Sequence, residues 1–327
     1  MELFNPKKMH FPFVKSFKVF VPLSLAAFCI CLFMMFVKPG IKYGVDFRGG
    51  VEAGVAFKDA NIDPSALRKE LDPVIPGLSI VEVQGNITQG FSKEFLITGA
   101  TDEKDDAGKI LSEHLQKFGA KDTDWTISKL DSVGPRVGGE LKKSALMSII
   151  YTAILIMLYI YIRFDMRYSP GAIVGVLHDL VFTCGFLIIS GTEFSTNVVA
   201  ALLTLAGYSI NDTVVVFDRI REAESTMLGK SREAVVDYAI NSTLSRTVNT
   251  GLTTILSLII LYFIGGPSLR DFSLTLTVGV MIGIYSSIFV ASPLYLWGDK
   301  LLGAKSASPG APVKSHVKAN KIKEAKV

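Results

Sequence analysis

Long blocks of apolar residues alternate with short polar stretches along most of the chain. A membrane-spanning helix needs about 20 mostly apolar residues. Six blocks meet that requirement, at residues 17–36, 144–162, 170–190, 196–217, 247–264 and 274–296. The one long polar stretch, 37–143, lies between the first and second blocks. The pattern predicts an α-helical polytopic membrane protein with six transmembrane helices and a soluble domain between helices one and two.

The polar stretch has its own periodicity. Strands are predicted at 43–57, 78–85, 91–100 and 124–135, and helices at 63–71 and 102–119. Asp63 followed by Pro64 has the residue types of a helix start. The order strand, helix, strand, strand, helix, strand is typical of a ferredoxin-like α+β domain.

The charges around the blocks predict the orientation of the helices. The lysines before the first block are Lys7, Lys8, Lys15 and Lys18. Residues 40–142 contain 13 Lys and Arg against 17 Asp and Glu, whereas the rest contains 21 against 13. Because basic residues stay on the cytoplasmic side, we expect 1–16 and the C-terminus to be cytoplasmic and 37–143 to be exported. The first block lacks a small-residue cleavage site, so we expect a retained anchor and not a signal peptide.

Two further segments are charged. Residues 219–240 are too polar to span a membrane and are predicted to form an amphipathic helix on its cytoplasmic face. Residues 301–327 carry six lysines and one glutamate and are predicted to be a disordered basic tail. Such a tail either lies near anionic lipid or ribosomal RNA, or is simply solvated.

An ionisable residue, Asp212, interrupts the fourth block. A charge at this depth costs at least about 2.5 kcal/mol, so it is expected to face a bundle interior or a water cavity. Thr204, Tyr208 and Asn211 fall on the same helical face as Asp212.

The fifth block carries a second polar stripe, which we expect to face the polar residues of the fourth block. Its members are Arg246, Asn249, Thr250, Thr253 and Ser257. Asp212 and Arg246 enter the membrane from the same side, so the two can pair. A structural salt bridge and a functional switch remain equally open at this point, because buried pairs are weak evidence of function.

Other polar and small residues in the blocks allow more than one interpretation. His178 and Asp179 in the third block form either a proton relay or a pair that hydrogen bonds between helices. Gly171 with Gly175, and Gly279 with Gly283, have the spacing of close helix contacts.

Composition and motifs exclude several classes of protein. The chain is 49% hydrophobic, and its three cysteines all lie in apolar blocks, which argues against a disulfide framework or a metal site. It contains no nucleophile elbow, HExxH, Walker loop or dinucleotide fingerprint. We therefore predict a protein that is not an enzyme and needs no cofactor, with any transport energy coming from an ion gradient or a partner ATPase.

Four sequence blocks resemble the SecF family of protein-export membrane proteins. They are GVDFRGG (44–50), SVGPRVGGEL (132–141), GYSINDTVVVFDRIRE (207–222) and NSTLSRTVNTGLTT (241–254). The resemblance implies half of an RND-type transporter in the bacterial inner membrane, with 37–143 in the periplasm. It also implies that Asp212 and Arg246 are the proton-coupling residues, with a further essential aspartate supplied by SecD.

The resemblance implies partners as well. They are SecD, the SecYEG channel, unfolded preprotein and protons, with YajC and YidC as further candidates and no nucleic acid. The implied function is a subunit that uses the proton gradient to assist late steps of preprotein export. A passive scaffold for SecD and SecYEG is the alternative, and the small outer domain argues against a drug exporter.

Overall fold

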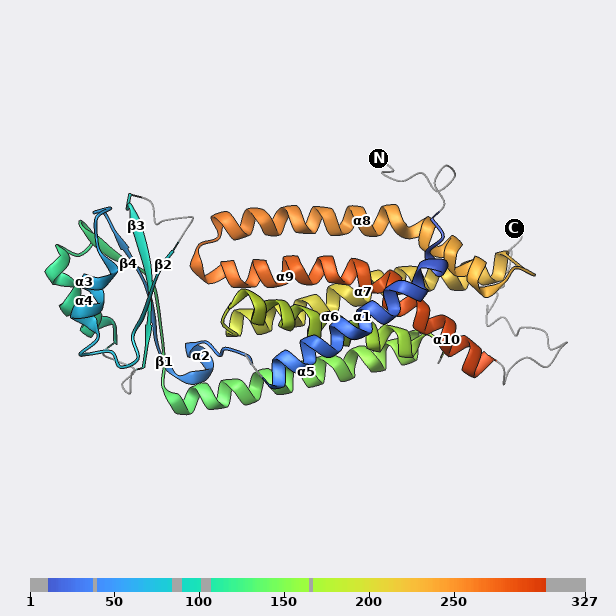
Figure 1. Ribbon diagram of the computed structural model, residues 1–327, viewed down its shortest axis with the longest axis horizontal. Coiled ribbons are helices and arrows are strands. Elements are labelled where there is room, and N and C mark those ends of the chain that lie inside the picture. The colour runs from blue at the N-terminus through green and yellow to red at the C-terminus, as the bar shows by residue number, and fades with distance from the viewer. Residues whose placement is uncertain (1–10, 38–39, 84–89, 101–106, 165–166, 304–327) are drawn as a thin grey trace, which may run out of the picture.

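The protein is a long helical bundle with a small α+β domain at one end (Figure 1). The computed structural model describes residues 11–37, 40–83, 90–100, 107–164 and 167–303. Within these residues, six helices are long and apolar enough to span a membrane, which confirms the predicted polytopic helical protein. Most of the segments predicted as a cytoplasmic N-terminus and a basic tail lie outside the described residues.

The bundle contains the predicted spans as helices, most of which are longer than predicted. They are α1 (Phe13–Phe36), α5 (Pro135–Arg163), α6 (Ser169–Ser190), α7 (Thr196–Thr226), α8 (Arg232–Ile264) and α9 (Pro267–Ser286). A π-helical turn, Ser287–Ala291, continues α9 into α10 (Ser292–Gly303). At 1.5 Å per residue, α8 alone is about 50 Å long and exceeds a hydrocarbon core of about 30 Å.

The segment 219–240 is not a separate surface helix, so that prediction is wrong. Its first part is the end of α7, its last part is the start of α8, and a turn at 227–231 joins them. Ser231 caps α8 by accepting a hydrogen bond from the backbone N–H of Ala234 at 3.3 Å. A helix with such a cap continues through polar residues outside the membrane. The spacing of apolar residues therefore does not show where the helix begins or ends.

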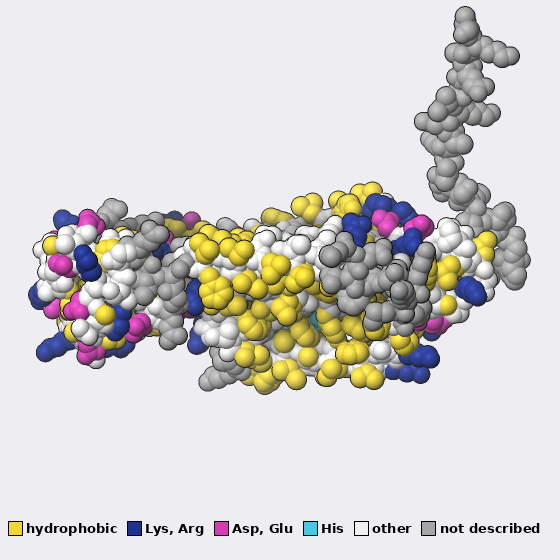
Figure 2. Space-filling model, turned by 90° about the horizontal axis from the view of Figure 1, so that it is seen from above, with side chains coloured by type: hydrophobic (Ala, Val, Ile, Leu, Met, Phe, Trp, Pro, Cys, Tyr) yellow, Lys and Arg dark blue, Asp and Glu magenta, His cyan; other side chains and the backbone are white. Residues whose placement is uncertain are grey.

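The surface of the bundle fits a lipid environment. Hydrophobic side chains cover its middle, and charged side chains gather towards its ends and on the α+β domain (Figure 2). Exposed apolar residues are especially frequent on α1, α5 and α8. An apolar surface that extends over several helices would promote aggregation in water, but it is expected where acyl chains surround the helices.

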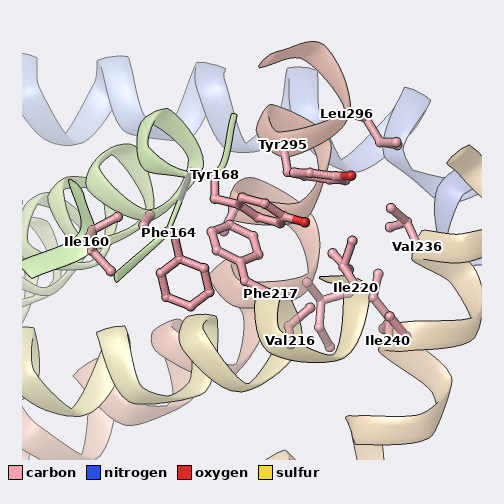
Figure 3. Close-up of a cluster of buried hydrophobic side chains, with 14 of the residues drawn as sticks. Ile160, Phe164, Tyr168, Val216, Phe217, Ile220, Val236, Ile240, Tyr295 and Leu296 are labelled. Carbon is pink, nitrogen blue, oxygen red and sulfur yellow. The ribbon is translucent and has the colours of Figure 1, made fainter. Parts of the chain in front are cut away.

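An aromatic cluster holds the end of the bundle far from the sheet (Figure 3). Tyr168, Phe217 and Tyr295 are buried there. The ring centroids of Tyr168 and Phe217 lie 5.3 Å apart, and those of Tyr168 and Tyr295 lie 4.7 Å apart. The rings come from the start of α6, from α7 and from α10, so the cluster joins elements that are distant in sequence.

The two glycines of the predicted contact on α6 are not equivalent. An added Cβ at Gly171 would lie 2.5 Å from the backbone oxygen of Ala291, whereas one at Gly175 would lie 3.6 Å from the Ala291 Cβ. We expect Gly171→Ala to lower the free energy of unfolding by about 1–3 kcal/mol, because backbone of the π turn must move. Gly175→Ala should change it by less than about 0.5 kcal/mol. Melting of both purified variants in one detergent checks this, and equal melting temperatures would contradict it.

The α+β domain is an antiparallel sheet with two helices on one face. Its strands are β1 (Gly50–Phe57), β2 (Ser79–Glu82), β3 (Lys93–Gly99) and β4 (Trp125–Val133), and its helices are α3 (Pro64–Leu71) and α4 (Ala107–Leu115), the latter followed by a 3-10 turn (Gln116–Phe118). The described strands follow the order β2-β3-β1-β4. From β1 to β4, strands and helices follow one another in the predicted order, and Asp63 caps α3 by accepting from the Ser65 N–H at 3.0 Å.

The first strand begins later in the chain than predicted. Residues 45–48 form a short helix, α2 (Val45–Arg48), and not the start of the strand expected at 43–57. Gly50 follows with φ at +131°, and an added Cβ there would lie 2.3 Å from the backbone oxygen of Gly99. The paired glycines therefore separate a helical turn from β1, and the alternation of apolar residues did not reveal the turn.

Helix α2 fixes the sheet domain to the bundle. Asp46 accepts hydrogen bonds from the backbone N–H and the hydroxyl of Thr196, at 2.7 and 2.6 Å, where α7 begins. A carboxylate is favourable at a helix N-terminus. From the other side, Gly138 of α5 lies so close that an added Cβ would be 3.2 Å from the Asp46 backbone oxygen. The sequence blocks at 44–50 and 132–141 are thus in contact and join the domain to α5 and α7.

Candidate functional site

Asp212 lies inside the bundle, on the buried side of α7. The residue is 3% exposed. Among the described residues, its Oδ2 atom has no hydrogen-bond partner. A buried polar atom without a partner is unusual and calls for an explanation, which a proton or a group from another chain can supply.

Arg246 lies on α8, at the surface of this bundle. Within the described part of the chain, no salt bridge joins it to Asp212, although the guanidinium is near enough to act electrostatically on the carboxylate. The predicted pair is therefore a pair of neighbours and not a closed ion pair in this arrangement.

The two polar stripes do not face each other as expected. On α7, Asn211 and Thr204 are exposed while Asp212 is buried, so the predicted single face is divided. On α8, Thr250 and Thr253 are exposed, and their hydroxyls donate to carbonyl oxygens of their own helix at 3.0 Å. Helical spacing alone could not distinguish the inner from the outer edge of a polar stripe.

A side-chain contact joins α7 and α8 next to these polar residues. The Thr254 hydroxyl donates to the Tyr208 hydroxyl at 3.4 Å, and both Tyr208 and Asn249 are partly buried. Near them, an added Cβ at Gly207 would meet nothing within 4 Å. The outer face of α7 and α8 is therefore built of small and polar residues and is open, and we call it the α7–α8 polar face (Thr204, Gly207, Asn211, Arg246, Thr250, Thr253 and Ser257).

The structure brings together a second set of polar residues, centred on Asp179 of α6. The His178 Nδ1 atom lies 3.0 Å from Asp179 Oδ1, and the His178 Nε2 atom lies 2.8 Å from the Ser24 hydroxyl of α1. The hydroxyls of Ser209 on α7 and Ser286 on α9 both donate to Asp179 Oδ2, at 2.5 and 2.8 Å. All five residues are buried, and together they form what we call the four-helix polar cluster.

Sequence reasoning found His178 and Asp179 but missed the serines. Serines 24, 209 and 286 are single hydroxyls in apolar helices, and such residues are common wherever helices pack closely. Nothing in their spacing connects them, because they lie on three different helices. Only the tertiary structure shows that Ser209 and Ser286 share the Asp179 carboxylate and that Ser24 contacts His178.

A large cavity separates the bundle from the sheet domain. It has a volume of about 1040 Å³ and is lined by the sheet face opposite α3 and α4 and by the adjoining ends of the bundle helices. Lys129 lies in its wall, 2.6 Å from Glu52 and 3.0 Å from Asp131. Burial acts to lower the pKa of Lys129, but the hydrogen bonds and charges of Glu52 and Asp131 outweigh burial and raise it. Burial raises the pKa of Glu193 on the opposite wall, against the charge of Arg48.

An ion-pair cluster lies at the other end of the bundle. Arg167 contacts Asp299 at 3.0 Å, and Arg232 contacts the same carboxylate at 3.2 Å and also pairs with Glu224. These contacts join the loop before α6 to the adjacent ends of α7, α8 and α10. Among the described residues, no group of three or more His, Cys, Asp or Glu side chains is arranged to hold a metal ion.

Comparisons with known proteins bear on the whole chain. Residues 113–300 match the family described as protein export membrane protein SecD/SecF, C-terminal. The protein translocase subunit SecF of Magnetococcus marinus is 39% identical over 90% of this chain and 93% of its own length. The SecDF subunit of Brucella abortus is 35% identical over 88% of this chain, but this chain spans only 37% of it.

A solved structure has the same overall arrangement. The crystal structure of SecDF from Thermus thermophilus, described as a translocon-associated membrane protein, superimposes with a TM-score of 0.75 at 33% identity. The match covers 91% of this chain and 39% of that protein. The bundle and the sheet domain described above therefore correspond to less than half of the longer protein.

Proposed function

The chain belongs to the SecD/SecF family of protein-export membrane proteins, and from that premise we propose that it couples proton movement to late steps of preprotein export. The observation that carries the coupling is Asp212, a buried intramembrane carboxylate with one unpaired oxygen among the described residues. Intramembrane carboxylates are costly and mark ion and proton paths. Because Asp212 is not held in a closed ion pair, it can take up and release a proton without breaking one.

The proposed partner is SecD, bound at the α7–α8 polar face. Arg246 and several hydroxyls are exposed there, at a depth where lipid cannot solvate them. Small and hydroxyl residues allow close helix packing and hydrogen bonds between helices. A second six-helix unit covering this face would supply partners to Arg246 and bring its own carboxylate near Asp212. The lengths of the SecDF relatives, of which this chain spans little more than a third, are consistent with such a second unit.

The orientation follows the same reasoning. We place the bundle in the bacterial inner membrane, the sheet domain in the periplasm as a ferredoxin-like module, and both termini in the cytoplasm. The arginines Arg163, Arg167, Arg219, Arg221 and Arg232 support this, since they lie at the end of the bundle far from the sheet. The SecYEG channel and an emerging preprotein would then meet the sheet domain on the outer side, while YajC and YidC remain candidate partners by resemblance.

Export with and without a proton gradient tests the coupling. Membrane vesicles that contain SecD, this chain and the channel should complete translocation of a preprotein intermediate faster when a gradient is imposed. A protonophore should remove the whole advantage that this chain confers. A passive scaffold would instead confer the same advantage with and without the gradient, and that result would overturn the proposal.

The partner face yields a separate prediction. Thr253→Trp should lower recovery of SecD with the tagged chain by roughly fivefold or more, because a bulky ring blocks close packing of small residues. Leu252→Trp is the matched control, since Leu252 is exposed and apolar on a different side of α8. Copurification from native membranes measures both. Equal SecD recovery in the two variants would place the partner elsewhere.

A further inference from the structure

The four-helix polar cluster is not used by the proposed proton site, yet its buried side chains are joined by four polar contacts. Asp179 accepts from two serine hydroxyls and contacts the His178 ring, and all five cluster residues are less than 9% exposed. Imidazole and carboxylate are both titratable, so a purely structural role would be an expensive choice for the interior of a membrane bundle.

The order Ser24–His178–Asp179 is that of a hydrolytic triad, but the surroundings exclude hydrolysis. A hydrolase needs free backbone N–H donors for an oxyanion and a path for substrate. Ser24 lies within α1, where backbone N–H groups are engaged in the helix, and its side chain is buried. Rings of Phe28, Phe182 and Tyr285 surround His178, with the Phe182 centroid 4.0 Å from the imidazole. The cluster is closed to any substrate.

Its position suggests a mechanical role instead. Ser209 precedes Asp212 by one helical turn on α7, so a shift of α7 at Asp212 also moves a donor to Asp179. Ser286 is the last residue of α9, immediately before the π-helical turn Ser287–Ala291. Such turns are frequent at functional sites, where a helix can change register.

The fourth helix connects the cluster to the sheet domain. Ser24 lies on α1, the helix that precedes α2 and β1 in the chain. The other helices of the cluster contact one another directly: an added Cβ at Gly283 would lie 3.6 Å from Asp179 Oδ2 and from the Ser209 Cβ. Asp179 thus contacts α7 and the last residue of α9, and its neighbour His178 contacts α1.

We propose that His178 and Asp179 are positioning residues that transmit displacement of α7 at Asp212 to α1, and through α1 to the sheet domain. The proposal rests on the proposed function, because it takes Asp212 as the source of the displacement. Loss of one donor leaves a buried carboxylate oxygen under-satisfied, so the bonds to Asp179 form and break together and not gradually. The cluster therefore acts as a two-position link between α7 and α1.

Two native thiols provide a reporter of the α1 position. Cys31 of α1 packs closely on α6, because an added Cβ at Gly185 would lie 2.5 Å from the Cys31 sulfur. Cys184 precedes Gly185 in the chain, and both cysteines are free thiols. In the full chain with SecD and with Cys29→Ser, oxidative cross-linking of Cys31 to Cys184 in membranes measures this contact. We expect Asp212→Asn to change the cross-linking yield by roughly threefold or more.

The cluster variants then decide whether that change passes through Asp179. In chains carrying Ser209→Ala or Ser286→Ala, the yield should become the same with Asp212 and with Asp212→Asn. Ser273→Ala is the control, since its buried hydroxyl donates to carbonyls of its own helix and lies outside the cluster. It should leave the response to Asp212→Asn intact.

Two results would overturn the link. One is a response to Asp212→Asn that persists with Ser209→Ala and Ser286→Ala, and the other is no response in the chain with an intact cluster. The proposed function is judged separately by the gradient dependence of export. Gradient-dependent export without a cross-linking response would overturn the link and leave that function standing.

Discussion

Replacing Asp212 by Asn is expected to reduce export of a secreted reporter by roughly tenfold or more in cells whose only copy of this chain is the variant. Asn has nearly the same shape as Asp but cannot release a proton. The buried site should therefore keep its packing while losing the group that titrates. Pulse-labelled export, normalised to the amount of chain and SecD in the membrane, measures the effect.

Arg246→Met belongs to the same test. Methionine fills the space of the aliphatic stem of arginine but removes the charge that acts on Asp212. We expect a similar loss of export, because the charge of Arg246 acts on the Asp212 carboxylate and so affects its uptake and release of a proton. Export near the native level in both variants would contradict the proposal that Asp212 couples proton movement to export.

Asp218→Asn is the matched control for Asp212→Asn. Asp218 lies on the same helix but pairs with Arg163 and Arg221, each at 3.1 Å, and its side chain is 37% exposed. Exposed ion pairs contribute about 0–1 kcal/mol to stability, so export should remain near normal. If Asp212→Asn lowers recovery of the SecD complex while export per complex is unchanged, the passive scaffold is the better account.

Trp125→Ala should unfold the sheet domain while leaving the bundle in place. Trp125 is fully buried in the core of the domain, and its indole N–H donates to the backbone oxygen of Gly119 at 2.9 Å. Removing such a side chain costs about 3–5 kcal/mol, and it also leaves a carbonyl without its partner. Domains of this size have only about 5–15 kcal/mol of stability, so the loss is a large part of the total.

Limited proteolysis of the full chain in membranes checks this expectation. The fragment between α1 and α5 should be digested in the variant at protease levels that spare it in the native chain. Leu130→Ala is the control, because Leu130 lies in the same strand and is 42% exposed. Equal protease resistance of Trp125→Ala and the native chain would show that the domain core does not depend on this ring.

The amino-acid sequence alone determined the membrane architecture, because apolar blocks of bilayer length admit few other structures. It also determined the order of strands and helices in the sheet domain, since a period of two and a period near 3.6 are local properties. It singled out Asp212, Arg246, His178 and Asp179, because each is a costly residue in an apolar block or directly beside one. The resemblance carried by 207–222 and 241–254 agrees with the family to which the chain belongs.

The sequence did not predict features that depend on contacts between segments distant in the chain. The segment 219–240 has an amphipathic period whether it forms one helix or two, and the turn at 227–231 decided between them. Gly171 and Gly175 share one spacing, but only the approach of the Ala291 backbone to Gly171 makes them differ.

The tertiary structure alone decided which polar atoms meet. Helical spacing placed Asn211 and Asp212 together, yet adjacent residues are about 100° apart, and the edge of the bundle passes between them. Ser209 and Ser286 converge on Asp179, and Ser24 contacts the neighbouring His178, each from a different helix. No periodicity within one helix records such a contact between helices. Intramembrane polar residues reveal from the sequence that a site exists, whereas packing between helices determines which of them share it.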